Sequence, residues 1–328
     1  MNRSLPLNIT LFALLCALAL ASLLAGRIWL SPAEILRGFF SAQSLASLIV
    51  VELRLPRTVL AILIGGALGL SGAVLQGLTR NPLAEPGLLG VTTGAALGAV
   101  IAIYFGLASV SSAVIPMLGL LGALAAIALT FSLGGGRGTL ALVLAGAAVS
   151  ALASALISLA LNFAPSPYAA YEIMTWLLGS LADRSWNHVA LAAPFIIVGC
   201  ALLLTAGRAL DTLALGEAQA GSLGVNLPRL RAVTLIGTAL AVGAATSVAG
   251  AIGFIGLIAP HLVRPLVGYA PRLVLMPAAL AGGVLLLAAD MGTRLVHFGP
   301  EMKLGVFTSL IGTPFFLWLV VRLKRTAP

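Results

Sequence analysis

Apolar runs about one membrane thickness long recur from one end of this chain to the other. A helix needs about 20 apolar residues, with a range of about 17–25, to cross a bilayer. Of the 328 residues, 60% are hydrophobic and 8% are charged, whereas a soluble domain carries roughly 25% charged residues. So few charges cannot cover a water-exposed surface, and the continuous runs lack the alternation of barrel strands. The sequence therefore predicts an all-α integral membrane protein.

Ten spans account for the apolar runs, and they form a single transmembrane domain over residues 1–328. The first is interpreted as a retained helix, because its run of about eighteen residues exceeds the 7–15 of a cleaved signal peptide. A glycine-rich stretch, Ala249–Gly256, predicts a break or re-entrant turn between the seventh and eighth spans. The predicted spans are residues 8–28, 57–78, 87–107, 112–133, 139–162, 189–206, 230–249, 252–268, 273–296 and 304–322.

The distribution of charge sets the topology. If the termini lie inside, the internal segments hold eleven cations and three acids, and the external segments hold seven cations and six acids. Cytoplasmic segments carry the excess of Lys and Arg in membrane proteins, so both termini are expected in the cytoplasm. The basic residues stand singly between apolar runs, which fits membrane topology and not a nucleic-acid surface.

Signatures of catalysis and metal binding are missing from the sequence. The motifs GxxxxGK[ST], G-x-S-x-G and H-E-x-x-H do not occur. The three histidines are far apart and show no ligand spacing, so no metal site is expected. His261 and Arg264 lie at the cytoplasmic end of the eighth span, where an interfacial structural role is expected. Cys16 and Cys200 lie in separate apolar runs and are expected to be inert thiols.

Three arginines lie on the external side, where topology does not require positive charge. Arg54 and Arg57 are one helical turn apart before the second span, and Arg294 follows Asp290 by four residues. One interpretation is snorkelling to headgroups together with an Asp290–Arg294 pair. The other, which we favour, is a basic rim that binds an acidic partner from outside.

The internal segment at about 210–229 is too long for a simple connector, because helix connections in bundles usually have 2–8 residues. Asp211 or Thr212 is expected to cap a short helix that carries Glu217 and ends at Gly221 or Gly224. A short helical hairpin across the membrane face would suit contact with another protein.

Small residues recur every fourth position in two spans, which lets helices approach closely in lipid. In the second span we expect the stripe to serve packing. In the fifth span the stripe carries hydroxyls, so packing and the lining of a water-filled path remain open. The two stripes are Gly65, Gly69, Ala73 and Gly77, and Gly146, Ser150, Ser154, Ser158 and Asn162.

Four blocks of the chain together resemble the FecCD-type permeases, the membrane subunits of bacterial ABC importers for iron–siderophore complexes, haem and cobalamin. The first block contains RNPLAEPG and the second LGEAQAGSLG; the third contains GFIGLIAPH and the fourth FTSLIGTP. The blocks occupy residues 54–95, 215–226, 250–268 and 287–320.

The resemblance implies a vitamin B12 permease-like bundle in the inner membrane, with ten spans per subunit and a path along the axis of a dimer, expected to be a homodimer. It also implies a pair of separate ATPase subunits that use ATP and Mg, a periplasmic substrate-binding protein, surrounding lipid and no nucleic acid. The chain itself is expected to bind no cofactor and to catalyse no reaction.

The resemblance also assigns roles to residues that match the family's motifs. Binding-protein docking falls to Arg54, Arg57 and Arg294. Coupling to the ATPase falls to the segment 211–226, with Asp211, Leu215, Gly216, Glu217, Leu223 and Gly224. The cytoplasmic gate falls to Asn81, Leu83, Gly138 and Thr139. Path lining falls to spans five and ten, with Gly146, Ser150, Ser154 and Ser158.

The chain departs from the family pattern before the last span. The family usually has Glu-Leu-Pro-Val-Gly, where this chain has Glu301-Met302-Lys303-Leu304-Gly305. Proline suits a first helical position, so its loss is expected to relax the start of span ten, and Lys303 adds a cation to the outer rim.

The resulting functional hypothesis is an ATP-driven importer that moves a bulky metal chelate from periplasm to cytoplasm by alternating access. A ferric siderophore is the first choice of cargo, with cobalamin or haem as alternatives. An ion-coupled secondary transporter is the competing class, but such proteins place ionisable groups near the bilayer midplane, and the predicted spans have almost none. A membrane enzyme is disfavoured because no catalytic constellation is present.

Overall fold

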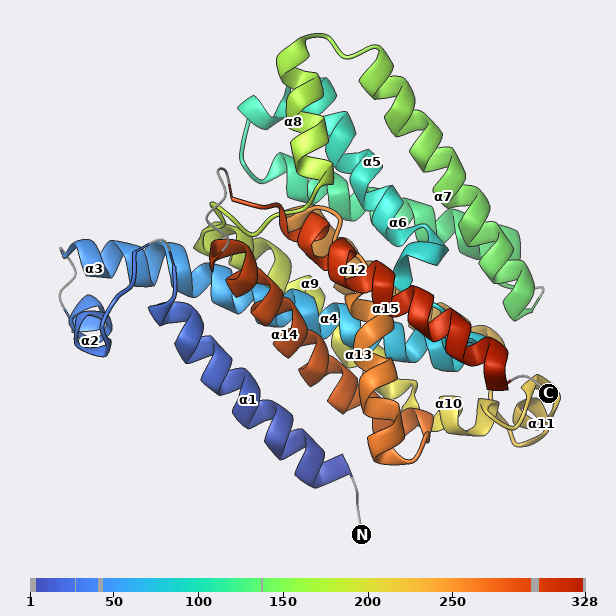
Figure 1. Ribbon diagram of the computed structural model, residues 1–328. Coiled ribbons are helices and arrows are strands. Elements are labelled where there is room, and N and C mark those ends of the chain that lie inside the picture. Colours follow the sequence, from blue (N-terminus) through green and yellow to red (C-terminus); the bar gives the residue numbers. More distant parts are fainter. Residues whose placement is uncertain (1–3, 27, 41–43, 137, 296–300, 327–328) are drawn as a thin grey trace.

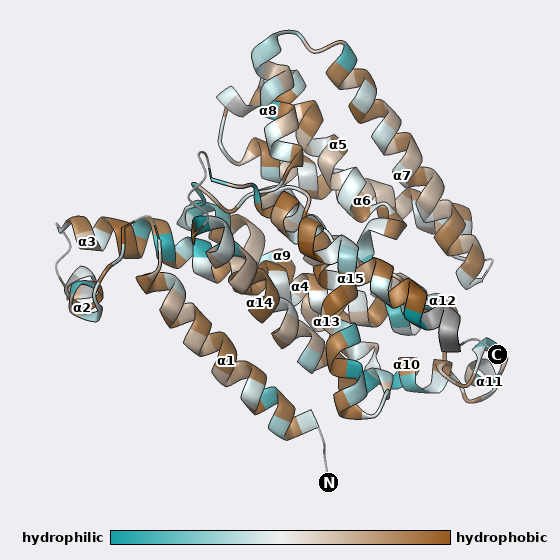
Figure 2. Cartoon of the chain, viewed as in Figure 1, coloured by the Kyte–Doolittle hydropathy of each residue, from teal (hydrophilic) through white to brown (hydrophobic). Residues whose placement is uncertain are grey.

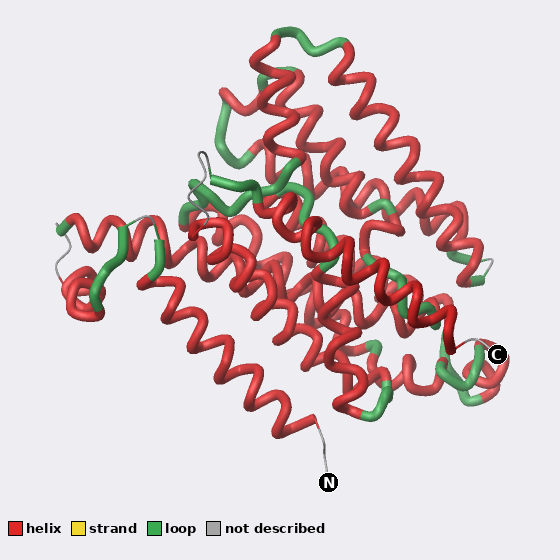
Figure 3. Tube along the Cα trace, in the orientation of Figure 1, coloured by secondary structure: helices red, strands yellow, loops and turns green. Residues whose placement is uncertain are grey.

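Helices and short loops make up all of the residues that the computed structural model describes, which are 4–26, 28–40, 44–136, 138–295 and 301–326. Figure 3 shows helices throughout and no strand in these ranges, which confirms the all-α prediction. The long helices are α1 (Ser4–Leu24), α4 (Leu55–Thr79), α6 (Val114–Gly134), α7 (Thr139–Asn162), α9 (Trp186–Thr205), α12 (Leu227–Ala249), α14 (Pro271–Leu295) and α15 (Leu304–Thr326).

The described residues contain eight helices that are long and apolar enough to cross a membrane, and they match eight of the ten predicted spans. The second begins early, because α3 (Leu45–Ser47) and a π-helical stretch, η1 (Leu48–Arg54), run directly into α4 to make one helix of 35 residues. Figure 2 shows hydrophobic residues along most of α1 and α7.

Residues 87–107 and 252–268 were predicted as the third and eighth spans. Both contain shorter apolar helices, α5 (Val91–Tyr104) and the pair α13 (Ile255–Val263) and η4 (Arg264–Val267). These helices are compatible with the predicted ten spans. At 1.5 Å per residue, the 14 residues of α5 rise about 21 Å, less than the hydrocarbon thickness of about 30 Å. Neighbouring helices bury most of α13, and irregular backbone is tolerated at membrane depth where protein covers it.

Two external helices were not predicted. The first is α2 (Pro32–Phe40), where Ser31 and Glu34 bond each other's backbone N–H groups in a capping box. The second is α8 (Pro167–Leu177), where the Ser166 hydroxyl accepts the Ala169 N–H at 3.1 Å. Both begin with a serine followed by proline, a start signal that a search for apolar spans does not use.

Helices α4 and α12 form the centre of the bundle. In the most apolar stretch of each helix 78% of the residues are buried inside the protein, whereas the share in α1 is 17%. Glycines allow a close contact between α4 and α14. A Cβ on Gly65 would lie 2.4 Å from the Gly282 carbonyl, and one on Gly69 would lie 2.1 Å from that of Ala278. The small-residue stripe of the second span therefore packs helices, as expected.

The break predicted at Ala249–Gly256 is confirmed. Helix α12 ends at Ala249, Gly250 and Phe254 have φ angles of 74° and 67°, and α13 begins at Ile255. The remaining short helices are α10 (Gly207–Leu213), α11 (Glu217–Ser222), η2 (Pro86–Leu89) and η3 (Leu107–Ser109).

The ends of the bundle differ in what they carry. Figure 1 places α2 and α3 at one end, and it places α10 and α11 at the other, toward the start of α1 and the end of α15. We call the end with α10 and α11 the inner end and the opposite one the outer end, following the charge-based topology.

Candidate functional site

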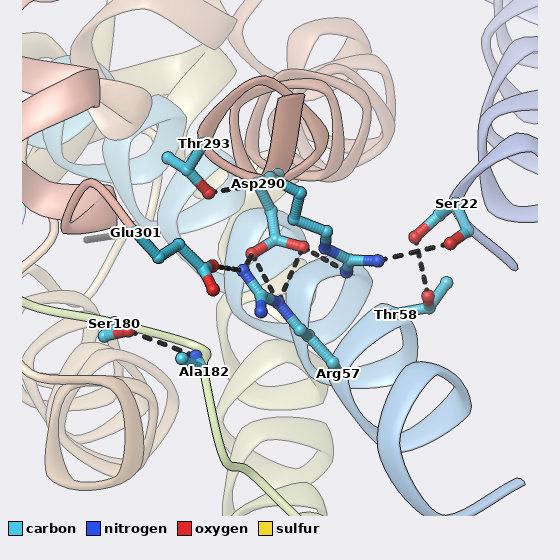
Figure 4. Close-up of polar contacts among 9 residues, drawn as sticks. Ser22, Arg57, Thr58, Ser180, Ala182, Asp290, Thr293 and Glu301 are labelled. Carbon is cyan, nitrogen blue, oxygen red and sulfur yellow. Dashed lines mark hydrogen bonds and ion pairs between the residues drawn. The ribbon is translucent and has the colours of Figure 1, made fainter. Parts of the chain in front are cut away.

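The first group of predicted site residues gathers at the outer end around one buried carboxylate. Asp290 of α14 is fully buried and pairs with Arg57 of α4 and with Arg294 one turn further along its own helix. The Arg57 Nε donates to both Asp290 oxygens at 2.9 and 3.1 Å. Arg57 also pairs with Glu301, just before α15 (Figure 4). We call Arg57, Asp290, Arg294 and Glu301 the outer ion cluster.

Arg54 lies beside this cluster, but its guanidinium bonds backbone carbonyls and not carboxylates. Its guanidinium donates to the carbonyls of Leu23 at 2.6 Å and Leu24 at 3.0 Å, and also to that of Ile28. These contacts satisfy carbonyls at the end of α1 that have no partner within the helix. Gly26 makes room for them, since a Cβ there would lie 2.7 Å from an Arg54 nitrogen.

The predicted rim is therefore largely inside the protein. Arg54 and Arg294 are 8% and 7% exposed, and their guanidinium groups bond partners within the chain. The Asp290–Arg294 pair considered at the sequence level is present. Snorkelling to headgroups is excluded for these two side chains by their burial, and any contact with a partner has to be made through a cavity.

Such a cavity exists. A space of about 260 Å³ opens among the loop after α1, η1, the loop before α9 and the outer ion cluster. Four arginines and two acids line it, so positive charge is in excess. The Nε atoms of Arg184 and Arg294 are buried and have no hydrogen-bond partner among the described residues. The charged lining residues are Arg54, Arg57, Arg184, Arg294, Asp183 and Glu301.

Arg184 was not singled out from the sequence. It lies in the loop between α8 and α9, and burial lowers its pKa, an effect partly opposed by Asp183. A guanidinium nevertheless stays charged in proteins. Arg184 is half-buried, and one of its terminal nitrogens lies 3.4 Å from His188 Nε2. Its buried Nε–H without a partner attracts an anion, because an unmade hydrogen bond leaves the desolvation cost of that group uncompensated. The sequence signal was weak, since Arg184 stands alone next to an acid.

The loop that carries Arg184 connects the outer cavity to the interior. The Ser180 N–H donates to the Ala249 carbonyl at the end of α12 at 2.7 Å, and the Gly305 N–H of α15 donates to the Gly179 carbonyl at 3.4 Å. Gly179 has a φ of 69°, and a Cβ there would lie 2.4 Å from the Ala251 carbonyl. The loop therefore ties the start of α9 to the α12–α13 break and to the beginning of α15.

A second cavity, of about 630 Å³, lies directly beyond this loop. The end of α8, the α12–α13 break and one face of α15 enclose it. Ser309 and Thr313 supply hydroxyls, the rest of the lining is apolar or glycine, and no charged side chain takes part. The lining residues are Leu177, Leu178, Ala251, Gly253, Gly305, Val306, Ser309, Leu310, Thr313 and Pro314.

The serine stripe of α7 is divided. A Cβ on Gly146 would lie 2.6 Å from the Leu88 carbonyl of η2, and the Ser150 hydroxyl donates to Gly87 at 3.3 Å. Ser154 and Ser158 are exposed. The inner half of the stripe therefore packs, and only the outer half is open to its surroundings.

Glu217 organises the inner end. Its carboxylate accepts a hydrogen bond from the Thr139 hydroxyl at the start of α7 and pairs with Arg231 of α12 at 3.0 Å. Arg231 also donates to the Gly135 carbonyl at 3.3 Å. The Thr139 hydrogen bond, with help from Arg231, holds the pKa of Glu217 below its usual value. The segment at 210–229 is thus bonded to the helix whose first residue was assigned to the gate.

The predicted coupling segment consists of two short helices, α10 and α11, in agreement with the helical hairpin expected there. Gly216 and Gly224, with φ angles of 116° and 85°, mark the turns before and after α11, which suits glycine because the left-handed region penalises other residues. Leu215 and Leu223 are 64% and 65% exposed. Two large apolar side chains exposed on turns outside the membrane-spanning helices suggest contact with a partner.

The expectation that Asp211 caps the coupling helix was wrong. Asp211 lies inside α10, and its carboxylate accepts the Arg272 N–H at the start of α14 at 2.8 Å. It therefore caps a neighbouring helix, because α10 begins earlier, at Gly207, than the pattern suggested. Gly224 does follow the end of α11, where its N–H donates to Gly221.

The other gate residues lie in the loop after α4. The Asn81 side chain accepts the Leu83 N–H at 2.9 Å, and Arg80 adopts a left-handed conformation with a φ of 52°. In the part of the chain that is described, no hydrogen bond or ion pair joins Asn81 or Leu83 to Gly138 or Thr139. The two halves of the predicted gate are therefore not bonded to each other here.

Glu85 in the same loop was also missed by the sequence reasoning. Burial raises the pKa of its carboxyl, and a hydrogen bond from the Phe254 N–H partly opposes that rise. Phe254 packs against Gly312 of α15, where a Cβ would lie 2.3 Å from the ring. The loop after α4 thus contacts the α12–α13 break, which in turn contacts α15.

Metal sites and disulfides do not appear in the described ranges. No group of three or more His, Cys, Asp or Glu residues is placed to hold a metal ion there. Cys16 and Cys200 are both free thiols. His261, expected to be structural, lies edge-on to Phe315 and Trp318 of α15, and Arg264 donates to the Gln76 side chain.

The arrangement of long apolar helices, an outer basic cavity and an inner helical hairpin is that of a transport permease. The profile of the FecCD transport family matches residues 14–322. The chain belongs to the FecCD transport family, the metal-chelate class of ABC importer permeases, and is a multi-pass membrane protein.

Several relatives support this placement. The hemin transport system permease protein HmuU of Yersinia pestis is 41% identical over 280 residues, which cover 84% of each chain. The vitamin B12 import system permease protein BtuC of Klebsiella pneumoniae is 39% identical over 316 residues, covering 94% of this chain and 91% of the relative. A solved structure described as an inward-facing conformation of an ABC transporter, assigned to the metal-chelate type, is 32% identical with a TM-score of 0.85, covering 97% of this chain and 99% of that one.

Proposed function

We propose that this chain is the permease subunit of an ATP-driven importer that carries a bulky metal chelate from the periplasm to the cytoplasm across the inner membrane. The single observation that carries this proposal is the Glu217 junction. A hairpin with two exposed leucines is bonded through Glu217 both to the start of α7 and to α12. A hairpin of that kind can pass movement of an external motor to two membrane helices at once.

The motor in this proposal is a pair of separate ATPase subunits that bind ATP and Mg, and the permease works as a homodimer. Leu215 and Leu223 provide the apolar contacts with the ATPase, and Gly216 and Gly224 allow the turns that present them. ATP binding shifts the permease between two arrangements by the difference in its affinity for them. No catalytic residue and no cofactor is assigned to this chain.

The path in this proposal runs along α15 and the outer half of α7. The cavity of about 630 Å³ beside α15 has only hydroxyls as polar groups, and Ser154 and Ser158 are exposed on α7. A wall of this kind binds a bulky cargo weakly, which favours release. Asn81, Leu83, Gly138 and Thr139 would close the inner end of this path.

The outer basic cavity is the proposed docking point for a periplasmic binding protein. Its excess of arginines and its two unpartnered Nε atoms suit an incoming carboxylate. Glu301 already forms an ion pair with the Arg57 guanidinium, so a carboxylate of the binding protein would compete with Glu301 for Arg57. The role proposed for Arg54, Arg57 and Arg294 thus extends to Arg184, and Glu301 becomes the internal competitor.

Transport into vesicles tests the proposed function. The chain would be reconstituted with its cognate ATPase and binding protein and supplied with labelled ferric siderophore, haem or cobalamin. Haem and vitamin B12 appear in the names of relatives, while a siderophore is the first choice. Uptake that needs ATP and the binding protein is expected for one of the three. Uptake driven by an ion gradient without nucleotide would support the secondary transporter instead.

Reversal of one charge in the outer cavity tests docking. We expect Arg184→Glu to weaken binding of the binding protein by at least about tenfold, because a carboxylate would face another carboxylate, and like charges at an interface cost several kcal/mol. Surface plasmon resonance at low and high salt measures the change. Asn187→Glu is the matched control, since Asn187 is exposed at the start of α9 but does not line the cavity. Equal loss in both variants would reject the cavity as the docking point.

A further inference from the structure

A polar cavity at the inner end has no part in the transport path. It has a volume of about 460 Å³ and lies between the end of α9 and α10 on one side and the start of α12 on the other. The chain leaves the membrane at one wall of this cavity and returns at the other, so the cavity sits at the base of the coupling segment. Its polar lining residues are Thr205, Arg208, Thr212, Asn226 and Arg229.

The two arginines give the cavity its chemical character. Both Arg208 and Arg229 are exposed, and no hydrogen bond or ion pair within the described ranges engages either guanidinium. No acidic side chain lines the cavity. Asp211, the nearest acid in sequence, is occupied with the Arg272 N–H.

The remaining polar side chains of the cavity each make a hydrogen bond within the chain. Thr205 and Thr212 donate to the carbonyls of Leu202 and Arg208, at 2.6 and 3.2 Å. The Asn226 side-chain oxygen accepts the Arg229 N–H at 2.9 Å. The free donors among the described residues of the cavity are therefore the Asn226 amide NH2 and the two guanidinium groups, and the planar forks of the guanidinium groups suit a phosphate.

The surroundings of the cavity show where such a phosphate would come from. The outer face of α9 is exposed and apolar along its inner half, with Ile197, Val198 and Leu204 at 59%, 53% and 40% exposure. Ile197 and Leu204 lie seven residues, or two turns, apart on α9, and α9 ends at Thr205, three residues before Arg208, so an apolar strip leads from the membrane toward Arg208. The acyl chains of a lipid can pack against that apolar strip, whereas a free phosphate ion gains nothing from it.

We propose that this cavity binds the phosphate headgroup of an anionic phospholipid of the cytoplasmic leaflet, with the acyl chains along α9. Arg208 and Arg229 hold the headgroup from the two sides. Basic residues at this leaflet are attracted by anionic lipid. The bound headgroup bridges the two arginines and fixes the base of the coupling segment. Binding of the lipid does not depend on the transport role proposed above.

Lipid binding to the purified chain tests this inference directly. The chain in neutral detergent would be titrated with phosphatidylglycerol or with phosphatidylcholine of the same acyl chains, and bound lipid counted by native mass spectrometry. We expect phosphatidylglycerol to bind with at least about tenfold preference and to raise the thermal unfolding midpoint. The double variant Arg208→Gln/Arg229→Gln loses that preference, and the double lysine variant keeps part of it because the charge remains.

Controls separate this site from general attraction to a basic surface. Arg272→Gln removes an exposed cation near the same surface that does not line the cavity, and it should leave the preference intact. Equal loss in Arg272→Gln, or unchanged preference in the double glutamine variant, would overturn the proposal. Stabilisation by inorganic phosphate alone, equal to that by phosphatidylglycerol, would show a site for a soluble anion and reject the lipid.

Discussion

Replacing Glu217 by arginine will lower the amount of cargo imported per ATP hydrolysed by at least about tenfold in the reconstituted complex. The carboxylate joins the coupling segment to Thr139 of α7 and to Arg231 of α12. Arginine at this position removes both bonds and places two cations together. A tenfold loss corresponds to about 1.4 kcal/mol, which is within the cost of breaking a charged hydrogen-bonded contact.

Simultaneous measurement of uptake and phosphate release gives the ratio. Ser222→Ala is the matched control, because Ser222 lies on the same short helix and its hydroxyl bonds only the Ala218 carbonyl of that helix. An unchanged ratio in Glu217→Arg would mean that the segment at 210–229 is only a connector.

The Glu217 junction also predicts how coupling depends on pH. Its pKa is lowered in the folded protein, so the contribution of the charged form is complete above the ordinary carboxyl value and is lost as pH falls through the lowered one. The ratio should therefore be constant as internal pH is lowered from about 7 to about 5. Glu217→Gln, which mimics the protonated form, should show the loss at neutral pH.

Replacing Asp290 by alanine will destabilise the protein by about 3–5 kcal/mol, the cost of breaking a buried ion pair by removing one partner. Asp290 is fully buried between Arg57 and Arg294. Without it, Arg294, whose Nε already lacks a partner, is left as a buried cation. Arg57 keeps only Glu301 as an ion-pair partner, and α4 loses its ion pair with α14.

Equilibrium unfolding in mixed micelles measures this change. Asp183→Asn is the control, because Asp183 is an exposed acid at the same end and Asn tolerates its positive φ of 58°; a change within about 0.5 kcal/mol is expected there. An Asp290→Ala variant as stable as the control would mean that the arginines are compensated by something other than the outer ion cluster.

Local patterns predicted the helices well where lipid was the solvent. Eight spans were found because an apolar run of membrane length has only one stable conformation in lipid. The break after Ala249 was predicted because glycine favours backbone angles that other residues avoid. The third and eighth spans were predicted a few residues too long at their ends, because hydropathy does not distinguish residues buried by lipid from residues buried by protein.

The candidate site was predicted in part. The sequence singled out Arg54, Arg57 and Arg294 from positive charge placed where topology gives no reason for it. It singled out Glu217 from an internal segment too long for a connector and from the family motif. It did not predict that Arg54 would satisfy the end of α1, or that Arg184 would complete the outer cavity. Asp211 was assigned to the wrong helix, since its partner Arg272 is distant in sequence.

The sequence by itself determined that lipid surrounds most of this protein, where its helices lie and to which family it belongs, because each follows from composition, apolar length or motifs within short stretches. Only the tertiary structure decided which polar groups distant in sequence meet. Asp290 pairs with Arg57, which is 233 residues away in sequence, and Glu217 accepts a hydrogen bond from Thr139, which is 78 residues away. Such pairs depend on how the helices pack. The glycine contacts that set this packing join segments that are distant in sequence, so no local sequence pattern predicts them.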